Sequence, residues 1–292
     1  MKIIKTLFLL LLCTAAFAQK KELPEDVVAS IKSRIEFGLT PSIVVGIIDK
    51  DGMHFYSFGT KTVGGEPVDE HSIYEIGSIS KTFTATLLAD NIVKGKMKVD
   101  DPISKYLPAS VKVPTYKGGG PPITLGHLSD HTSSMLRMPT NMPESDPTDP
   151  AADYTPELMY AFLSSYELPR EVGSEYEYSN FAVGVLGQIQ ALAAGTSYEE
   201  ALTSVITSPL KMKETAITLS PKMKENLAVG HSMGMPVNNW DLNAMQGAGG
   251  IRSSAHDMLL YLSANLGLTK SQLSKAMELT HTPRHDKAGR QI

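Results

Sequence analysis

Two short motifs carry the groups that serine acyl transfer needs. Ser78–Lys81 (SISK) opens an apolar segment, and Tyr178–Asn180 (YSN) follows about a hundred residues later. A serine hydroxyl can attack a carbonyl when a nearby lysine amine or tyrosine phenol accepts its proton, and this chemistry requires neither histidine nor metal. The motifs therefore indicate a serine nucleophile with a lysine and tyrosine base system.

The context of Ser78 favours this reading over a chance match. Gly77 precedes the serine and permits close backbone approach. We predict a helix from Ser78 to Val93, so that backbone N–H groups at its N-terminus would stabilise an oxyanion. Lys81 would lie over the same helix face, where desolvation favours its neutral amine. The alternative is that Ser78 only caps the helix and Lys81 is solvated. A second S-x-x-K at Ser208–Lys211 lies in an expected helix end and turn, and we interpret it as coincidental.

The second motif is the only Y-x-N among 11 tyrosines. Tyr178 can exchange a proton near Ser78 and Lys81, and a neighbouring ammonium would favour its phenolate. Asn180 can donate to a substrate carbonyl and hold Lys81 in place. The alternative is that Ser179 or Asn180 caps a helix, which is common. Both interpretations can hold at once.

Together these segments resemble the class C β-lactamase and penicillin-binding serine hydrolase family. His131–Ser133 is similar to the family's H-T-S-G loop, with Ser134 where glycine is usual. Further stretches agree: Asp100–Pro108 and Gly247–Ser254 resemble the family, and Val113–Tyr116 with Pro122–Leu125 is similar to its D-alanyl-D-alanine carboxypeptidase/endopeptidase branch. By position, the resemblance implies that Ser78 is the acylated nucleophile, Lys81 and Tyr178 the base system, and Asn180 a substrate-positioning residue.

The resemblance also implies a fold and a substrate class. It implies an α+β fold of the β-lactamase/DD-peptidase type, an antiparallel sheet flanked by helices with an inserted all-helical lobe. The expected activity is an acyl-enzyme reaction on D-Ala-D-Ala peptides of peptidoglycan, on β-lactams, or on both. A β-lactamase-like esterase and a non-catalytic binding or remnant protein are the alternatives.

One feature of the family pattern is missing. We find no Lys-Thr-Gly or His-x-Gly on a strand after the glycine-rich stretch. His231–Gly234 precedes that stretch, and Ser129–His131 is not the Ser-Asp-Asn of other penicillin binders. Because the sequence given stops at Ile292, before the family's last strands, we expect those strands to be absent from it and the sequence to be a fragment or a truncation.

Periodicity predicts strands first, then a mostly helical middle, then a glycine-rich return. We expect a helix over Glu25–Phe37 and a hairpin of Ser42–Ile48 with Met53–Phe58. Further helices are expected at Leu125–Leu128, Thr155–Leu163, Phe181–Ala194, after the capping box of Ser197–Glu200, and at Met258–Leu266. We expect 19–80 and about 235–292 to form an α/β lobe, and about 81–234 a helical lobe.

Composition limits the other classes of function. The chain has 292 residues and a net charge of -4, which gives no sign of a nucleic-acid partner. Residues 1–18 resemble a signal peptide too short to span a bilayer, so we expect a periplasmic or secreted protein. A lipid anchor at Cys13, the only cysteine, fits less well. His127 and His131 lack the glutamate of H-E-x-x-H, and we expect no cofactor, no metal and a monomer.

Overall fold

The computed structural model describes residues 22–143, 145–284, 286–287 and 290–291. The expected signal peptide and Cys13 lie outside them. The helices are α1 (Glu25–Glu36), α2 (Ser80–Val93), α3 (Leu125–Ser129), α4 (Pro156–Ser165), α5 (Asn180–Ala194), α6 (Tyr198–Leu202), α7 (Pro221–Glu225), α8 (Gln246–Gly249), α9 (Ala255–Asn265) and α10 (Ser274–Thr280). The strands are β1 (Ser42–Asp49), β2 (Gly52–Gly59), β3 (Ile73–Glu75), β4 (Gly230–Ser232), β5 (Met235–Val237), β6 (Arg252–Ser254), β7 (Asp286–Lys287) and β8 (Arg290–Gln291).

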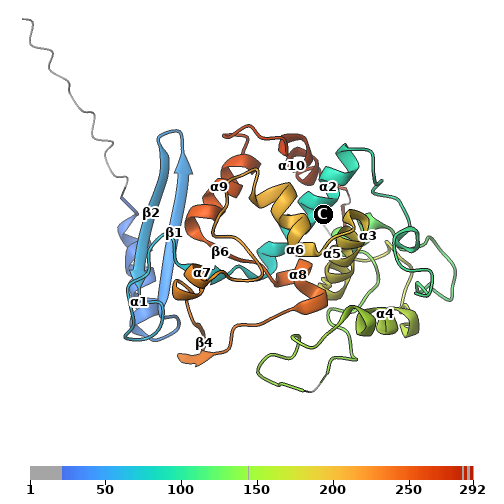
Figure 1. The fold of residues 1–292 in the computed structure, drawn as a ribbon, viewed down its shortest axis with the longest axis horizontal. Helices are drawn as coiled ribbons and strands as arrows, with labels where there is room; N and C mark the ends of the chain where they lie inside the picture. The colour runs from blue at the N-terminus through green and yellow to red at the C-terminus, as the bar shows by residue number, and fades with distance from the viewer. Residues whose placement is uncertain (1–21, 144, 285, 288–289, 292) are drawn as a thin grey trace, which may run out of the picture.

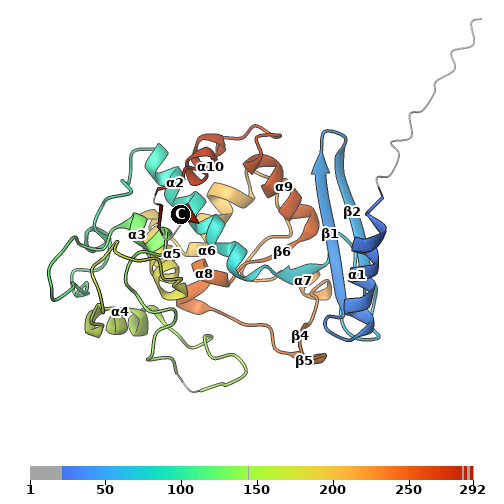
Figure 2. The same ribbon diagram turned by 180° about the vertical axis from the view of Figure 1, so that it is seen from behind.

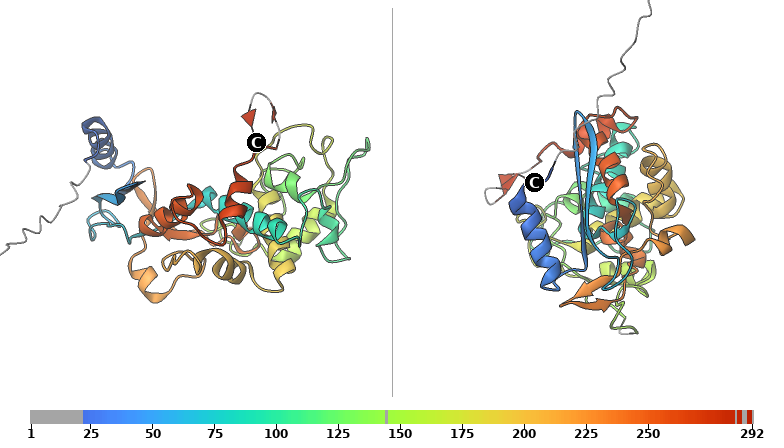
Figure 3. Two further views of the ribbon diagram at one scale, coloured as in Figure 1. Left: turned by 90° about the horizontal axis from the view of Figure 1, so that it is seen from above. Right: turned by 90° about the vertical axis from the view of Figure 1, so that its left-hand side faces the viewer.

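A layered unit stands at one end of the molecule. β1 and β2 form an antiparallel hairpin in which Ser42 pairs with Gly59 and Asp49 with Gly52. Lys50 and Asp51 make its two-residue turn, the tight connection that the sequence predicts. Helix α1 lies on the outer side of the hairpin and α9 on its inner side (Figures 1 and 2), and α1 runs alongside the strands (Figure 3). The expected α+β arrangement is therefore present.

Helix α2 runs through the middle of the molecule and carries the first motif. It packs against α5, α8 and α10. Leu88 belongs to one hydrophobic cluster, centred on α3, α4 and α5, whereas Phe83 and Leu87 belong to another, built with α9 and α10. A helix that is apolar on several faces is a buried helix. Hydrophobic clusters on both sides thus fix the α2 backbone, and the backbone position of Lys81 is fixed with it.

Close contacts fix α2 against α5 and α8. A Cβ on Gly247 would lie 3.0 Å from the Cα of Gly187 and 3.1 Å from Thr84 Oγ1, so only glycine lets these segments approach. The fully buried Thr84 hydroxyl donates to the Gly247 carbonyl at 2.8 Å and lies 2.6 Å from the Tyr198 hydroxyl. This network holds α8 beside the first turns of α2.

We expect Thr84→Val to lower the free energy of unfolding by about 1–3 kcal/mol. Valine has the same shape and β-branching, so the change removes only the hydroxyl and leaves the Tyr198 hydroxyl and the Gly247 carbonyl buried with a partner lost. Urea unfolding followed by circular dichroism measures the effect.

Thr82→Val is the matched control. Thr82 lies on the same helix but is exposed, and its hydroxyl donates to the Ile79 carbonyl at 2.8 Å. Its loss should change the free energy of unfolding by no more than about 0.5 kcal/mol. Equal effects of the two substitutions would contradict the structural importance of the Thr84 network.

A short ladder between β3 and β6 leads directly to the first motif. Ile73 pairs with Ser254 and Glu75 with Arg252. The buried Arg252 guanidinium donates to the Ile217 carbonyl at 2.9 Å and to Asp241 Oδ1 at 2.9 Å. These bonds gather segments that are distant in sequence beside β3. His71 lies two residues before this strand and Ser78 three residues after it.

Local signals located most helices and their caps. Thr155 accepts from Leu158 N, Ser197 and Glu200 form the expected capping box, and Ser254 accepts from Asp257 N at the start of α9.

One prediction was wrong in detail: the helix expected from Ser78 begins as a 3-10 turn, η1 (Gly77–Ile79), before α2. The two-lobe division stays a prediction. No helix of the described residues is long and apolar enough to cross a bilayer.

Candidate active site

Ser78 lies in η1 and its side chain is exposed to solvent. Gly77 has φ +50°, in the left-handed region that side chains other than glycine rarely adopt. A Cβ at this position would have no atom within 4 Å. The close backbone approach expected at Gly77 is therefore wrong, and the glycine is needed for its positive φ, which turns the chain from β3 into the helix.

The side chains of Tyr178 and Lys81 meet at the Ser78 hydroxyl. Its Oγ lies 2.6 Å from the Tyr178 hydroxyl, and Lys81 Nζ donates to it at 3.0 Å. Lys81 Nζ also donates to the Ala248 carbonyl of α8 at 2.6 Å. The structure thus brings together Ser78, Lys81 and Tyr178 from the two motifs, and the glycine-rich stretch supplies the carbonyl that orients the amine.

Tyr178 is held by the loop that begins at His131. The Ser179 N–H donates to His131 Nδ1 at 3.1 Å, and the Ser179 hydroxyl donates to the Leu136 carbonyl at 2.6 Å. Ser179 also caps α5 by accepting from Ala182 N at 2.9 Å. The capping interpretation and the site interpretation therefore both hold, since the cap anchors the residue next to the phenol.

The side chain of Asn180 has a different partner from the one expected. Its Nδ2 donates to Met138 Sδ at 3.4 Å, and among the described residues no hydrogen bond joins it to Lys81. The expectation that Asn180 holds Lys81 in place is wrong for this structure, in which the Ala248 carbonyl does so. Asn180 keeps its place beside Tyr178, and a sulfur acceptor is weak enough for the amide to exchange for a substrate carbonyl.

Burial is the main influence on the Lys81 amine. Burial lowers the pKa of Lys81 below its ordinary value, contact with Tyr178 opposes this, and the Arg137 charge adds to the lowering. A lysine with a lowered pKa has a larger neutral fraction at neutral pH, and only the neutral amine can accept a proton. The amine is therefore suited to act as a base toward Ser78.

Two cations face the Tyr178 ring. Lys81 Nζ lies 4.9 Å and the Arg137 guanidinium 5.1 Å from its centroid. Burial raises the pKa of Tyr178, but polar contacts with Lys81 and Ser78 and both positive charges outweigh it, and the net pKa is lowered. Sequence reasoning missed Arg137, whose only signal was its position four residues after the end of the H-T-S motif.

Comparison with known proteins identifies the family of this chain. Residues 31–291 match the family described as Beta-lactamase. The chain belongs to the beta-lactamase family.

Several relatives of known type are similar over most of the chain. D-alanyl-D-alanine-carboxypeptidase/endopeptidase AmpH of Escherichia coli K12 is 31% identical over 287 residues, covering 94% of this chain and 73% of that protein. A class C beta lactamase from Rhodobacter sphaeroides superposes with a TM-score of 0.75 at 28% identity, covering 88% of this chain and 70% of that one. A beta-lactamase/D-alanine carboxypeptidase from Yersinia pestis gives 0.77 at 26% identity, covering 90% and 75%.

Ser134 stands where the H-T-S-G motif of the beta-lactamase family has glycine, and the structure explains how serine is accommodated there. Ser134, in the glycine position, has φ +62°, so the backbone there demands the left-handed conformation that glycine adopts most easily. The buried Ser134 hydroxyl donates to the Arg170 carbonyl at 2.9 Å. A new hydrogen bond thus offsets part of the conformational cost of having a Cβ.

His131 contributes to the site as a neutral ring. Its centroid lies 4.5 Å from that of Tyr178, and its Nδ1 accepts from Ser179 N. Burial, with the nearby Lys81 charge, lowers the pKa of His131 to about 4. At neutral pH the ring therefore adds no third positive charge beside Tyr178. The sequence placed His131 in a family motif, but its acceptor role depends on contacts with distant residues.

This low pKa predicts a loss of stability in acid. The unfolded chain protonates His131 near pH 6.5, whereas the folded chain keeps it neutral until about pH 4, so stability is lost as the pH falls between these values. We expect the free energy of unfolding of the wild type to fall by roughly 2–3 kcal/mol more than that of His131→Asn between pH 7 and pH 4. Urea unfolding across that pH range measures the difference.

Asparagine is the suitable replacement because two features of His131 are preserved. Asn tolerates φ +62° better than other residues, and its Oδ1 can accept from Ser179 N as Nδ1 does. Carboxylates titrate equally in both proteins and cancel in the comparison. Parallel pH curves for the two proteins would contradict a buried neutral histidine.

Proposed function

We propose that this chain is an exported serine hydrolase that acts through an acyl-enzyme at Ser78 on D-Ala-D-Ala peptides of peptidoglycan, on β-lactams, or on both. One observation carries the proposal: an exposed serine hydroxyl lies 2.6 Å from the Tyr178 phenol and 3.0 Å from the Lys81 amine. A nucleophile within hydrogen-bond reach of its base, with the base oriented by a third group, is the arrangement of covalent catalysis.

In the acylation step, Ser78 Oγ attacks the substrate carbonyl carbon while its proton passes to the Lys81 amine or to the Tyr178 phenolate. The tetrahedral intermediate places negative charge on the carbonyl oxygen. N–H groups in the first turn of a helix have no intrahelical partner, so the Ser78 N–H at the start of η1 is suited to stabilise that oxygen.

Collapse of the intermediate breaks the carbonyl C–N bond. The proton taken from Ser78 returns through the Tyr178 hydroxyl to the leaving nitrogen, which is free D-alanine for a peptide and the opened ring for a β-lactam. Water then attacks the carbonyl of the Ser78 ester and the same base accepts its proton. The bond from that carbonyl to Ser78 Oγ breaks, the base returns the proton to Oγ, and the acid product leaves. Asn180 would hold the substrate amide carbonyl during both steps.

The names of the relatives support the proposed substrate class. Residues 1–18 support the proposed location outside the cytoplasm. AmpH is named as a D-alanyl-D-alanine-carboxypeptidase/endopeptidase and the Rhodobacter protein as a class C beta lactamase. Both substrate types present a carbonyl next to a scissile C–N bond and a nearby carboxylate. The basic and apolar residues 1–18 support export, which would bring the protein to the compartment that holds peptidoglycan.

Fluorescent penicillin labelling tests the proposal. The expected result is a covalent adduct that survives denaturation and maps by mass spectrometry to the peptide containing Ser78. A folded chain that stays unlabelled at high probe concentration would instead favour a non-catalytic binding protein. Circular dichroism of the same sample establishes that the chain is folded.

Two assays then distinguish the substrates. Nitrocefin hydrolysis reports β-lactamase turnover, and D-alanine release from a muramyl pentapeptide reports carboxypeptidase turnover. Rapid labelling with slow nitrocefin hydrolysis and steady D-alanine release would identify a peptidase that β-lactams inhibit. Hydrolysis of p-nitrophenyl esters alone would identify the esterase alternative.

A further inference from the structure

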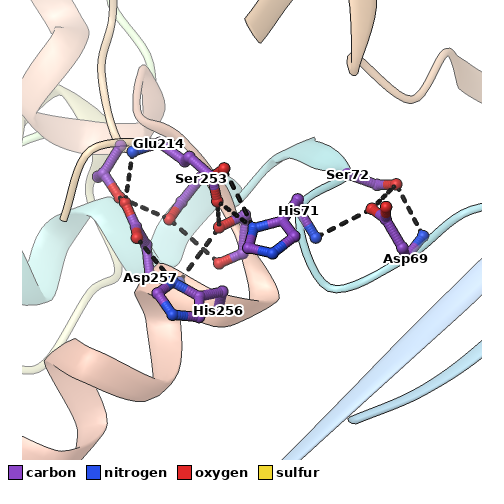
Figure 4. Close-up of polar contacts among 9 residues, drawn as sticks. Asp69, His71, Ser72, Glu214, Ser253, His256 and Asp257 are labelled. Atoms are coloured by element: carbon purple, nitrogen blue, oxygen red, sulfur yellow. Dashed lines mark hydrogen bonds and ion pairs between the residues drawn. The ribbon is translucent and has the colours of Figure 1, made fainter.

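A second group of chemistry-bearing side chains lies on the other side of β3 from Ser78. His71 precedes β3, Glu214 lies in the segment between η3 (Thr203–Thr207) and α7, and His256 is in the first turn of α9. Their side chains converge although they come from three separate segments (Figure 4). We call these three residues the His-Glu-His cluster.

The cluster has the dimensions of a metal-binding site. One ligand atom from each residue lies within 4.8 Å of the others. His71 Nδ1 lies 3.1 and 3.0 Å from the two Glu214 carboxylate oxygens. Tetrahedral zinc with bonds of 2.0–2.2 Å places neighbouring ligand atoms about 3.3–3.6 Å apart. Small side-chain rotations would therefore bring all three ligands to one ion.

Contacts outside the cluster hold Glu214 in place. The Ser254 hydroxyl donates to Glu214 Oε2 at 2.7 Å, and the Glu214 N–H donates to Asp257 Oδ2 at 2.6 Å. The carboxylate of Asp257 is buried, and its Oδ1 lies 3.3 Å from His256 Nδ1. Carboxylates and hydroxyls that orient the ligands in this way are the usual surroundings of protein metal sites.

The backbone before β3 is also fixed. Asp69 Oδ1 accepts from the His71 N–H at 3.0 Å and from the Ser72 hydroxyl at 3.0 Å. The His71 side chain is about half exposed, at 46%, whereas that of Glu214 is only 20% exposed. The cluster is therefore open to solvent on one side, through which an ion and a water ligand can enter.

We propose that His71, Glu214 and His256 bind one zinc ion, with water as the fourth ligand. Two imidazoles and one carboxylate are a donor set that zinc favours over calcium or magnesium, which prefer all-oxygen ligands. The ion would replace the hydrogen bond between His71 and Glu214. His127 and His131, on which the sequence-based expectation of no metal rests, do not belong to this cluster.

The ion would cross-link three segments around the β3–β6 ladder. His71 precedes Ile73 by two residues, His256 follows Ser254 by two, and Ile73 and Ser254 are paired. A metal bond across that pair would fix the start of β3, the end of the strand that is farther from Ser78 along the chain. The site is structural, because the proton transfers described above use none of its three ligands.

Zinc titration of the untagged full chain tests the proposal. Isothermal titration calorimetry after chelator treatment should give one zinc ion per chain. Glu214→Gln and His256→Ala should each weaken zinc binding by at least about tenfold. Zinc at a hundredfold excess over its dissociation constant should raise the Tm of the wild type by about 5 °C, and that of the variants much less.

His54→Ala is the matched control. His54 Nε2 lies 3.4 Å from Asp49 Oδ1, so it too is a histidine beside a carboxylate, but it belongs to no cluster of three among the described residues. Its loss should leave zinc affinity unchanged. Equal affinity in the wild type, Glu214→Gln and His256→Ala would overturn the proposal, as would a wild type that binds no zinc.

Cobalt provides a second readout that does not depend on the variants folding. Co²⁺ in a low-symmetry site of two histidines and a carboxylate should give intense visible absorption bands with the wild type, and zinc should abolish them. A spectrum indistinguishable from aqueous Co²⁺ would overturn the site. Neither measurement involves Ser78, so failure of the metal site and failure of the acyl-enzyme proposal are separable.

Discussion

Ser78→Ala is expected to abolish covalent labelling by fluorescent penicillin and to lower hydrolysis of the preferred substrate by about 10⁴-fold or more. The reason is that the exposed Ser78 Oγ, 3.0 Å from the Lys81 amine, is the atom that forms the bond to the substrate carbonyl, and alanine has no atom that can do so. Binding of substrate would remain, because Asn180 and the helix start are unchanged. Stopped-flow labelling and steady-state turnover measure the two losses.

Ser208→Ala is the matched control for this prediction. Ser208 begins the second S-x-x-K of the chain, but it lies in the turn after η3, where Lys211 has φ +60° and is exposed. Its substitution should leave labelling and turnover unchanged. Both serines are exposed, so neither substitution should alter the free energy of unfolding by more than about 0.5 kcal/mol. Labelling that survived Ser78→Ala would refute the assignment of the nucleophile.

The contrast between these two motifs shows what the sequence could predict. Both have the same residues at the same spacing, and only their surroundings differ. Gly77 and the apolar run to Val93 marked the first as a turn into a buried helix, and the structure places both there. Helix caps were predictable for the same reason, since a cap depends on residues three positions apart.

Local sequence patterns could not predict the contacts between segments that are distant in the chain. Lys81 donates to the carbonyl of Ala248, 167 residues away, and any residue type could supply that carbonyl. Arg137 reaches the Tyr178 ring because the loop after His131 is folded against the start of α5. The His-Glu-His cluster draws on residues 71, 214 and 256, whose spacing matches no metal motif. Such groups are recognisable only once the fold has brought them together.

Lys81→Met is expected to slow acylation of Ser78 by about 10²–10⁴-fold, the usual effect of losing a general base. Methionine keeps the length and apolar stem of lysine, so it fills the same half-buried space between α2 and α8 without the amine. The Ala248 carbonyl loses its donor, and Tyr178 loses its positive neighbour. The rate of fluorescent penicillin labelling under single-turnover conditions measures the effect directly on the chemical step.

The pH dependence of the residual rate separates the base from a purely structural lysine. The Lys81 charge helps to lower the pKa of Tyr178, so its removal should raise that pKa and move the alkaline rise of the labelling rate to higher pH. A structural role would lower the rate without moving the profile. Lys211→Met, the same change in the second S-x-x-K, should leave both rate and profile as in the wild type. An unshifted profile in Lys81→Met would show that the phenol does not depend on the amine, and the coupled base system would then be wrong.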